Sequence, residues 1–255
     1  MKRLKPPKTT KTAMLDYYGE LYPLLVQIKK RFDNVVMEQA ALDRVQEEIV
    51  DESALTTLRK AFADFKAKIN KSIDEERINR IAKKITKRAA KKNRRWWVKK
   101  LETFGIDITS KATFEGEKDY LSSRISTNTT LITKMKNEYI EQLNTVLFNS
   151  YEQGTPLRQL TKDVQNQFRI SKNKAKLIAR NETKNTNTQM NKKQAQELGF
   201  DQAVWLTSKD ERVRAEHRKH SNKTYTIGVG LDDGKGGKEE PGDKINCRCS
   251  FYLKI

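Results

Sequence analysis

Apolar residues recur every seven positions near the amino terminus, and this repeat constrains the fold more than any other feature. The repeating residues are Leu21, Ile28, Val35, Leu42 and Ile49. A seven-residue repeat places them on one stripe of an α-helix, and such a stripe needs an apolar partner along its length. Because only 36% of the residues are hydrophobic and 33% are charged, the sequence predicts long packed helices with polar faces rather than one tight globule.

Three further helices are predicted before residue 152. Apolar residues at spacings of three and four over 55–69 indicate an antiparallel return helix, which the polar residues 51–53 separate from the first. The same periodicity predicts helices over 78–101 and 120–151.

The segment between Gly154 and Gly199 predicts two more helices. Thr155 is an N-cap residue and Pro156 suits the first helical turn, so a short helix starts there. Ser171 is predicted to cap a second helix, which ends at Gly199 in a left-handed terminator.

The pattern changes after residue 199. Residues 203–207, 224–227 and 247–253 are strand-like, with a short polar helix after the first. Residues 228–244 hold six of the eleven glycines and are predicted to form a mobile loop. These segments indicate a small α+β module.

The predicted fold class is therefore mostly α, with an elongated region of antiparallel long helices and a small carboxy-terminal α+β module. We divide the chain into a disordered basic arm (1–14), a long-helix region (15–150) and a terminal module (151–255).

Basic residues dominate the charge, since the formal net charge is +19. Such an excess indicates a polyanionic partner, most simply nucleic acid. The densest cluster lies on the third predicted helix, where the cations can follow phosphates without reading bases. The alternative is a solvated helix face, with Trp96 and Trp97 as core or interface anchors. The candidate DNA-binding residues are Lys83, Lys84, Lys87, Arg88, Lys91, Lys92, Arg94, Arg95, Lys99 and Lys100.

Four residues offer a candidate metal site, namely His217, His220, Cys247 and Cys249. Two histidines and two thiolates can bind zinc tetrahedrally, although a Cys-x-Cys spacing is tighter than structural zinc sites usually use. The alternative, which we prefer, has a buried, hydrogen-bonded His217, an exposed His220 and cysteines that act as small core residues, so no cofactor is expected.

Several enzyme classes lack support in the sequence. It contains no Walker loop, nucleophile elbow, Rossmann glycines or clustered carboxylates suited to two metal ions, which disfavours a packaging ATPase or a nuclease. The pair Arg180 and Glu182 is interpreted as an ion pair that holds its helix to a neighbour. No apolar run could span a membrane, and prolines replace the apolar stretch of a signal peptide, so we expect cytoplasmic synthesis and no membrane partner.

Three stretches, residues 179–183, 205–217 and 241–249, resemble in order and spacing the signature of the phage Mu F-like head morphogenesis family. There, a helix with an Ala-Arg-Thr-Glu-like motif precedes a tryptophan strand, an Asp-x-Arg-x-x-x-x-His segment and a terminal Asn-Cys-Arg-Cys. Asn181 departs from the usual threonine, and Arg214 stands where some relatives have a cysteine. The matching residues are Arg180, Glu182, Trp205, Asp210, Arg212, His217, Asn246, Cys247, Arg248 and Cys249.

The resemblance implies a non-enzymatic minor capsid protein of a tailed bacteriophage, found in the virion inside the capsid. The expected partners are the phage portal protein, double-stranded DNA bound without sequence preference, and the major capsid protein. The long helices of 15–150 are expected to face the portal or capsid. The alternative is a cytoplasmic nucleic-acid-binding protein or zinc-dependent enzyme with a helical arm.

Overall fold

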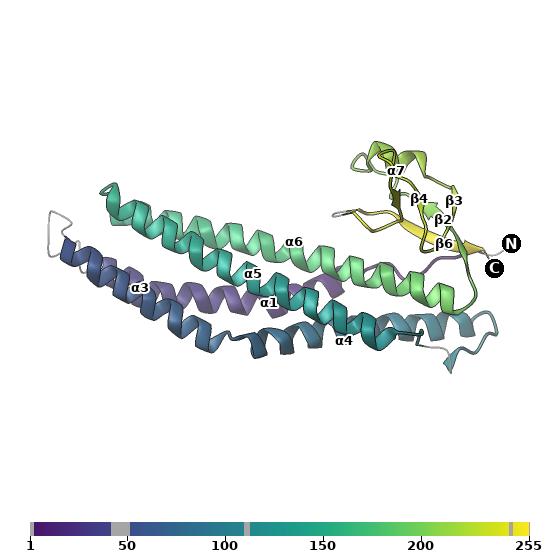
Figure 1. Ribbon diagram of the computed structural model, residues 1–255, viewed down its shortest axis with the longest axis horizontal. Helices are drawn as coiled ribbons and strands as arrows, with labels where there is room; N and C mark the ends of the chain where they lie inside the picture. The colour runs from purple at the N-terminus through teal and green to yellow at the C-terminus, as the bar shows by residue number, and fades with distance from the viewer. Residues whose placement is uncertain (1–2, 42–51, 110–112, 245–246, 255) are drawn as a thin grey trace. The chain divides into compact units, whose positions relative to one another are not determined.

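The structure is a computed structural model that describes residues 3–41, 52–109, 113–244 and 247–254 (Figure 1). It is 68% helical with a small carboxy-terminal antiparallel sheet, which confirms the predicted fold class. The helices are α1 (Lys11–Phe32), the π-helix η1 (Asp33–Met37), α3 (Glu52–Ser72), α4 (Glu75–Glu102), α5 (Glu117–Glu152), α6 (Leu157–Glu197) and α7 (Ala215–Lys219). The strands are β1 (Arg3–Leu4), β2 (Gln202–Leu206), β3 (Thr224–Thr226), β4 (Leu231–Asp232), β5 (Lys238–Glu239) and β6 (Ser250–Lys254).

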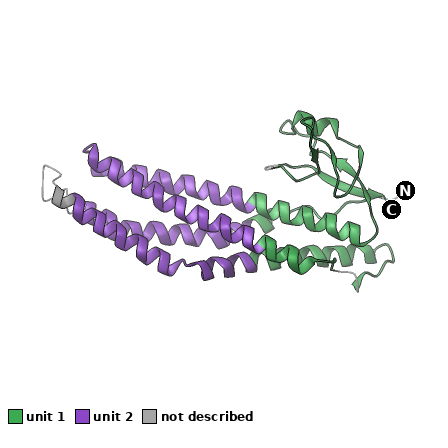
Figure 2. Cartoon of the chain, in the orientation of Figure 1, with its two compact units in different colours: residues 1–14, 84–124, 180–255 green, residues 15–83, 125–179 purple. Residues whose placement is uncertain are grey.

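The chain divides into two compact units (Figure 2). Unit 1 comprises residues 1–14, 84–124 and 180–255, and unit 2 comprises residues 15–83 and 125–179. This division differs from the predicted boundary at residue 150, because α4, α5 and α6 each contribute residues to both units.

Unit 2 is built on the predicted apolar stripe of α1. Leu21 and Ile28 are fully buried, as the seven-residue repeat requires. The π-helix η1 adds a residue to the turn, so Val36 rather than Val35 occupies the next fully buried position. The predicted seam residues Leu42 and Ile49 lie outside the described part of the chain.

The predicted helices over 55–69, 78–101 and 120–151 are confirmed as α3, α4 and α5. The prediction of a new helix at Ser171 is wrong, since α6 continues from Leu157 to Glu197. Ser171 is buried inside this helix, and the packing of its neighbours there outweighs the preference of serine for an N-cap.

Unit 1 contains a four-stranded antiparallel sheet in the order β1-β6-β2-β3. Its first strand corrects the prediction of a disordered arm over 1–14. Arg3 and Leu4 pair with Lys254 and Leu253, and Leu4 is fully buried. The composition of this segment predicted disorder because the segment offers little apolar surface to bury. The strand forms because its backbone groups pair with β6 at the other end of the chain, which local composition cannot reveal.

The predicted strands are confirmed within a few residues as β2, β3 and β6. In the segment that was predicted to be a mobile loop, β4 and β5 form a two-stranded antiparallel ribbon. The Asp233 side chain accepts hydrogen bonds from the backbone N–H groups of Lys235 and Gly237 in its turn, at 2.8 and 2.9 Å.

The core of unit 1 joins the sheet to α4 and α6. Trp97, Trp205 and Phe251 belong to one buried cluster, and Trp96 packs against it. The expectation that the two neighbouring tryptophans serve as core anchors is therefore confirmed for Trp97. Within the described residues, none of the helices combines the length and the apolar character that crossing a bilayer needs.

Candidate functional site

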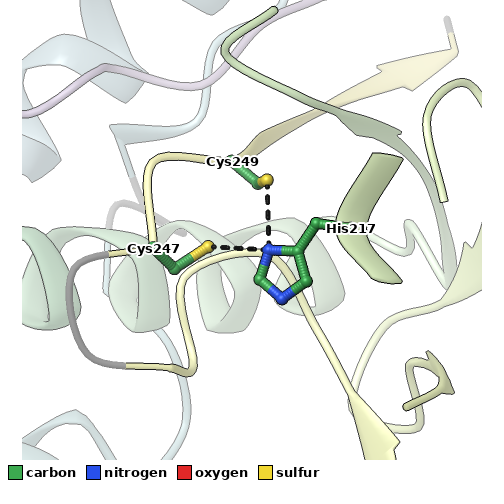
Figure 3. A group of neighbouring side chains, drawn as sticks. All are labelled: His217, Cys247 and Cys249. Carbon is green, nitrogen blue, oxygen red and sulfur yellow. Dashed lines mark hydrogen bonds between the residues drawn. The ribbon is translucent and has the colours of Figure 1, made fainter. Parts of the chain in front are cut away.

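Three side chains of unit 1 converge in a buried cluster (Figure 3). His217 lies on α7. Cys247 and Cys249 lie in the segment directly before β6. The Nδ1 atom of His217 is 3.6 Å from Sγ of Cys247 and 3.5 Å from Sγ of Cys249. Figure 3 shows both sulfur atoms directed at the same ring nitrogen.

Glu239 of β5 fixes the orientation of the imidazole. Its carboxylate oxygen lies 3.2 Å from Nε2 of His217, within hydrogen-bond distance. Because a carboxylate accepts hydrogen bonds, this contact favours a hydrogen on Nε2 and leaves Nδ1 facing the two thiols. Lys244 Nζ lies 2.6 Å from the same carboxylate, which is only 4% exposed, and so compensates its buried charge.

His220 does not join the cluster. Its Nε2 atom lies 3.3 Å from Glu239, and its ring centroid lies 4.8 Å from that of Trp205. His220 is buried, so the expectation of an exposed His220 is wrong. The expectation of a buried, hydrogen-bonded His217 is confirmed.

The environment shifts the pKa values of the two thiols in opposite directions. The hydrogen bond from Cys249 lowers the pKa of Cys247 to about 5, against the opposing effect of burial, and backbone N–H groups help. One of these is the N–H of Gly242, 3.4 Å from the Cys247 sulfur. The same thiol–thiol hydrogen bond, together with burial, raises the pKa of Cys249.

Gly242 brings this backbone N–H close to the thiol. Its φ of +93° is in the region that favours glycine, and a Cβ atom there would lie 2.8 Å from Cγ2 of Thr188 on α6. A larger residue would therefore displace the loop that carries Cys247.

The cluster fits three of the four ligands of a zinc ion. Zinc bonds of about 2.0–2.3 Å at tetrahedral angles place a nitrogen and a sulfur ligand about 3.6 Å apart, and the two observed distances are 3.6 and 3.5 Å. The Glu239 contact is the carboxylate–histidine arrangement that usually supports a zinc-bound imidazole. Of the four predicted ligands, His217, Cys247 and Cys249 come together, and His220 contacts the supporting carboxylate instead.

The other family-motif residues fall into two groups. Arg180, Arg212 and Arg248 line one cavity of 630 Å³ together with the two cysteines. Arg248 also pairs with Asp210. Trp205 is in the core, 5.3 Å from His217 between ring centroids, and Asn246 lies outside the described residues.

The predicted ion pair of α6 has a different partner. Glu182 pairs with Arg124 of α5, both about 14% exposed or less, so the carboxylate does hold its helix to a neighbour. Burial raises the pKa of Glu182, and the guanidinium of Arg124 opposes that shift. Arg180, the predicted partner, faces the cavity instead.

The predicted DNA-binding cations lie along α4. We define the α4 basic face as its exposed members in unit 1, namely Lys84, Lys87, Arg88, Lys91, Lys92, Arg95 and Lys99. Lys83 is also exposed but belongs to unit 2. Arg94 and Lys100 are half-buried, and Arg94 pairs with Glu117 at 2.7 Å.

Sequence reasoning missed Glu239, Lys244 and Lys184. The first two lie in the segment interpreted as a glycine-rich loop, where no periodicity marks them. Lys184 Nζ donates to the carbonyl oxygen of Cys247, and burial lowers the pKa of this lysine. Its place four residues after Arg180, on the same helix face, was the one available signal.

Comparisons with known proteins agree with the motif. Residues 141–252 match the family model described as Phage Mu protein F like protein. An uncharacterized protein of Haemophilus influenzae is 23% identical over 122 residues, which are 48% of this chain and 26% of that relative. The match thus spans about a quarter of the relative's length. No solved structure matches. The region of residues 141–252 therefore belongs to the phage Mu F-like family, a family of phage head morphogenesis proteins.

Proposed function

We propose that this protein is a minor head protein of a tailed bacteriophage. In this proposal it lies inside the capsid beside the portal, contacts the packaged DNA, and assists head morphogenesis and DNA packaging or delivery without catalysing a reaction. The observation that carries the proposal is the family match over residues 141–252. The net charge of +19 supports a role next to DNA.

The α4 basic face is the proposed DNA contact. Its seven cations recur at spacings of three and four along one helix, so they share an exposed side while Trp97 and Ala90 point into the core. Lysine and arginine on a straight helix can neutralise phosphates along the DNA backbone. Such contacts position a protein on DNA and carry little sequence information.

DNA binding by the full chain tests this contact. We expect affinity for a random duplex to fall steeply with salt and to depend little on sequence. Replacing Lys87, Arg88, Lys91, Lys92 and Arg95 with glutamine should reduce the magnitude of the slope of log K against log salt concentration by about 4–5.

A matched control removes the same charge elsewhere. Arg59, Lys60, Lys66, Lys68 and Lys71 are exposed on α3 in unit 2, and their replacement with glutamine should change the salt slope much less. Equal losses in both variants would show that the total charge, rather than the α4 basic face, drives binding.

Unit 2 is the proposed contact with the portal. It exposes large apolar side chains on α1, including Tyr22 and Val26, and on α6, including Ile170. The Tyr22 and Phe168 rings lie 6.3 Å apart, so these two helices adjoin here. Exposed apolar groups on neighbouring helices are typical of a protein-binding surface.

Incorporation into procapsids tests this contact. A Tyr22→Ser, Val26→Ser double variant should enter procapsids less often and bind DNA like the parent protein. The control is Lys60→Gln, an exposed change on α3. Normal incorporation of the double variant would move the proposed docking surface elsewhere, and a gene position far from a portal gene would argue against the whole proposal.

A zinc-dependent enzyme is the second candidate function. The observation that favours it is the donor set of two cysteines and one histidine, because catalytic zinc sites use three protein ligands and leave one position open. Turnover of a nucleic acid or nucleotide by zinc-loaded protein, lost in Cys249→Ala, would favour this candidate. Metal-independent DNA binding with no turnover favours the head protein.

A further inference from the structure

The cavity of 630 Å³ in unit 1 gathers positive charge from segments that are distant in the sequence. Six cationic side chains line it, and no aspartate or glutamate is among its described lining residues. The six are Lys8, Arg180, Lys184, Arg212, Arg214 and Arg248.

These cations come from four segments. Lys8 precedes α1, Arg180 and Lys184 lie one turn apart on α6, two arginines precede α7, and Arg248 precedes β6. A run of basic residues spreads its charge over a helix surface, whereas here the tertiary structure concentrates it around one hollow. Like charges around a concave surface with a low-dielectric wall focus a field that attracts anions.

Polar groups of the cavity can bind an anion. Arg248 pairs with Asp210, and the described lining residues include no carboxylate. Arginine guanidinium groups bind phosphate oxygens in a two-point arrangement, and the hydroxyl and amide groups of Thr207, Ser208 and Asn187 on the same wall add further hydrogen-bonding groups.

The cavity also has some apolar lining residues, and its volume is limited. Pro6, Pro7, Met14 and Phe251 contribute apolar wall, which suits the flat ring of a base. The volume lies within the range of small-molecule sites, about 300–1,000 Å³. A DNA duplex, whose major groove alone is wide enough to admit an α-helix, is too large for a cavity of this volume.

We infer that this cavity binds a nucleotide, with its phosphate held by Arg180, Arg212 and Arg248 and its base against the apolar wall. The ligand is either a free nucleotide or the phosphorylated terminal nucleotide of a DNA strand. The site is separate from the α4 basic face, so the inference does not rest on the DNA contact proposed above.

Calorimetric titration of the full chain tests the inference. The probes are inorganic pyrophosphate, adenosine 5′-monophosphate and adenosine. Both phosphate compounds should bind and adenosine should bind much more weakly. Arg180→Gln and Arg212→Gln should each weaken phosphate binding about tenfold or more, because each removes a charged hydrogen-bonding group from the anion.

Three controls keep a loss of binding interpretable. Lys219→Gln removes an exposed cation of α7 that does not line the cavity, and it should leave binding unchanged. Circular dichroism and thermal melting must show that both arginine variants fold. Arg212→Lys keeps the charge and should lose less affinity than Arg212→Gln.

A short single-stranded oligonucleotide, with and without a 5′-phosphate, separates the two sources. Tighter binding of the phosphorylated strand, lost in Arg212→Gln, identifies a strand end. Binding of the mononucleotide alone identifies a free nucleotide. The inference is overturned if no phosphate probe binds, or if Arg180→Gln and Arg212→Gln bind pyrophosphate as the parent does.

The variants of the α4 basic face distinguish this inference from the proposed DNA contact. The five-residue glutamine variant should lose duplex affinity and keep pyrophosphate binding. The arginine variants should show the reverse. If a set of variants leaves its expected binding unchanged, whether to duplex or to pyrophosphate, the assignment of that surface fails and the other assignment stands.

Discussion

The two units have different interiors. Unit 2 is held by apolar contacts, among which the rings of Phe32, Phe62 and Phe65 lie 5.4–6.4 Å apart. Unit 1 also has an apolar cluster, and beside it buries more charged and hydrogen-bonding side chains than unit 2, where Asn128 and Lys136 are among the buried polar groups. Glu239, His217 and Lys192 are each no more than 4% exposed.

Polar contacts connect the helices of unit 1. The Oδ1 atom of Asn191 on α6 accepts hydrogen bonds from Asn93 at 2.7 Å and from the Trp97 indole at 3.1 Å. Its amide donates to the carbonyl oxygen of Pro7 at 3.1 Å. Lys192 lies 3.0 Å from Glu240 and 2.9 Å from Asp243, which anchors α6 to the loop before Cys247.

This difference separates a supporting region from a chemically specialised one. Burying polar and charged groups contributes little net stability compared with apolar packing of similar volume, and removing one partner is costly. Local departures from apolar packing concentrate at functional sites. The polar interior of unit 1, which carries the family motif, therefore indicates where the function resides, while unit 2 supplies the apolar helix packing.

A large effect on stability is expected in the apolar core of unit 2. Phe65→Ala should lower the free energy of unfolding by about 3–5 kcal/mol, because it leaves a cavity where a fully buried ring packed. Urea unfolding followed by far-ultraviolet circular dichroism measures this change. Phe65→Leu is the matched control and should cost much less, and a small loss in the alanine variant would mean that unit 2 is loosely packed.

Zinc should stabilise unit 1 without being needed for its fold, because an apolar cluster that includes Trp97, Trp205 and Phe251 already holds this unit together. At free zinc about 100 times its dissociation constant, the gain is about 2.7 kcal/mol. Trp96, Trp97 and Trp205 all lie in unit 1, so tryptophan fluorescence during unfolding reports on this unit.

Elemental analysis supplies the control for zinc. His217→Ala and Cys247→Ala should lose the metal, and His220→Ala should retain it because His220 contacts Glu239 instead. Unfolding of unit 1 on chelation would overturn the expectation of a metal-independent fold. Absence of zinc in protein purified with added zinc would overturn the metal site.

Breaking the Lys192 contacts should cost about 2 kcal/mol. Lys192→Met leaves Glu240 and Asp243 without their cation, and the cost stays below the 3–5 kcal/mol of a fully buried pair because Asp243 is partly exposed. Lys192→Met combined with Glu240→Gln and Asp243→Asn should recover much of the loss. A combined variant as unstable as the single one would show that packing, rather than charge, is the cause.

A pH dependence of stability is also expected, from Cys247 in metal-free protein. Folding lowers its pKa from the ordinary 9.0 to about 5, so the unfolded chain binds more protons between these values and stability rises with pH there. The contribution is lost as the pH falls through about 5. The raised pKa of Cys249 acts in the opposite direction above pH 9.

Urea unfolding at several pH values, with thiolate absorbance as a second readout, measures this dependence. Cys247→Ser should remove the rise, while Lys219→Gln should preserve it. A parent protein without thiolate absorbance at neutral pH would contradict the assigned pKa.

The amino-acid sequence by itself determined the helices whose periodicity is local. The steps of three and four in α3, α4 and α5 need only the neighbouring turns to be interpreted, and the alternating segments of β2 and β3 need only their own residues. The family motif likewise identified the cysteines and His217 before their geometry was known.

Only the tertiary structure decided the features that depend on distant partners. Leu4 becomes part of a strand because it pairs with Leu253, and Ser171 lies within a continuous helix because packing there outweighs its capping preference. The ribbon of β4 and β5 places Glu239 against both His217 and His220. The cavity joins cations from four segments, and no local pattern encodes such a meeting, because contacts between distant segments arise only when the whole unit folds.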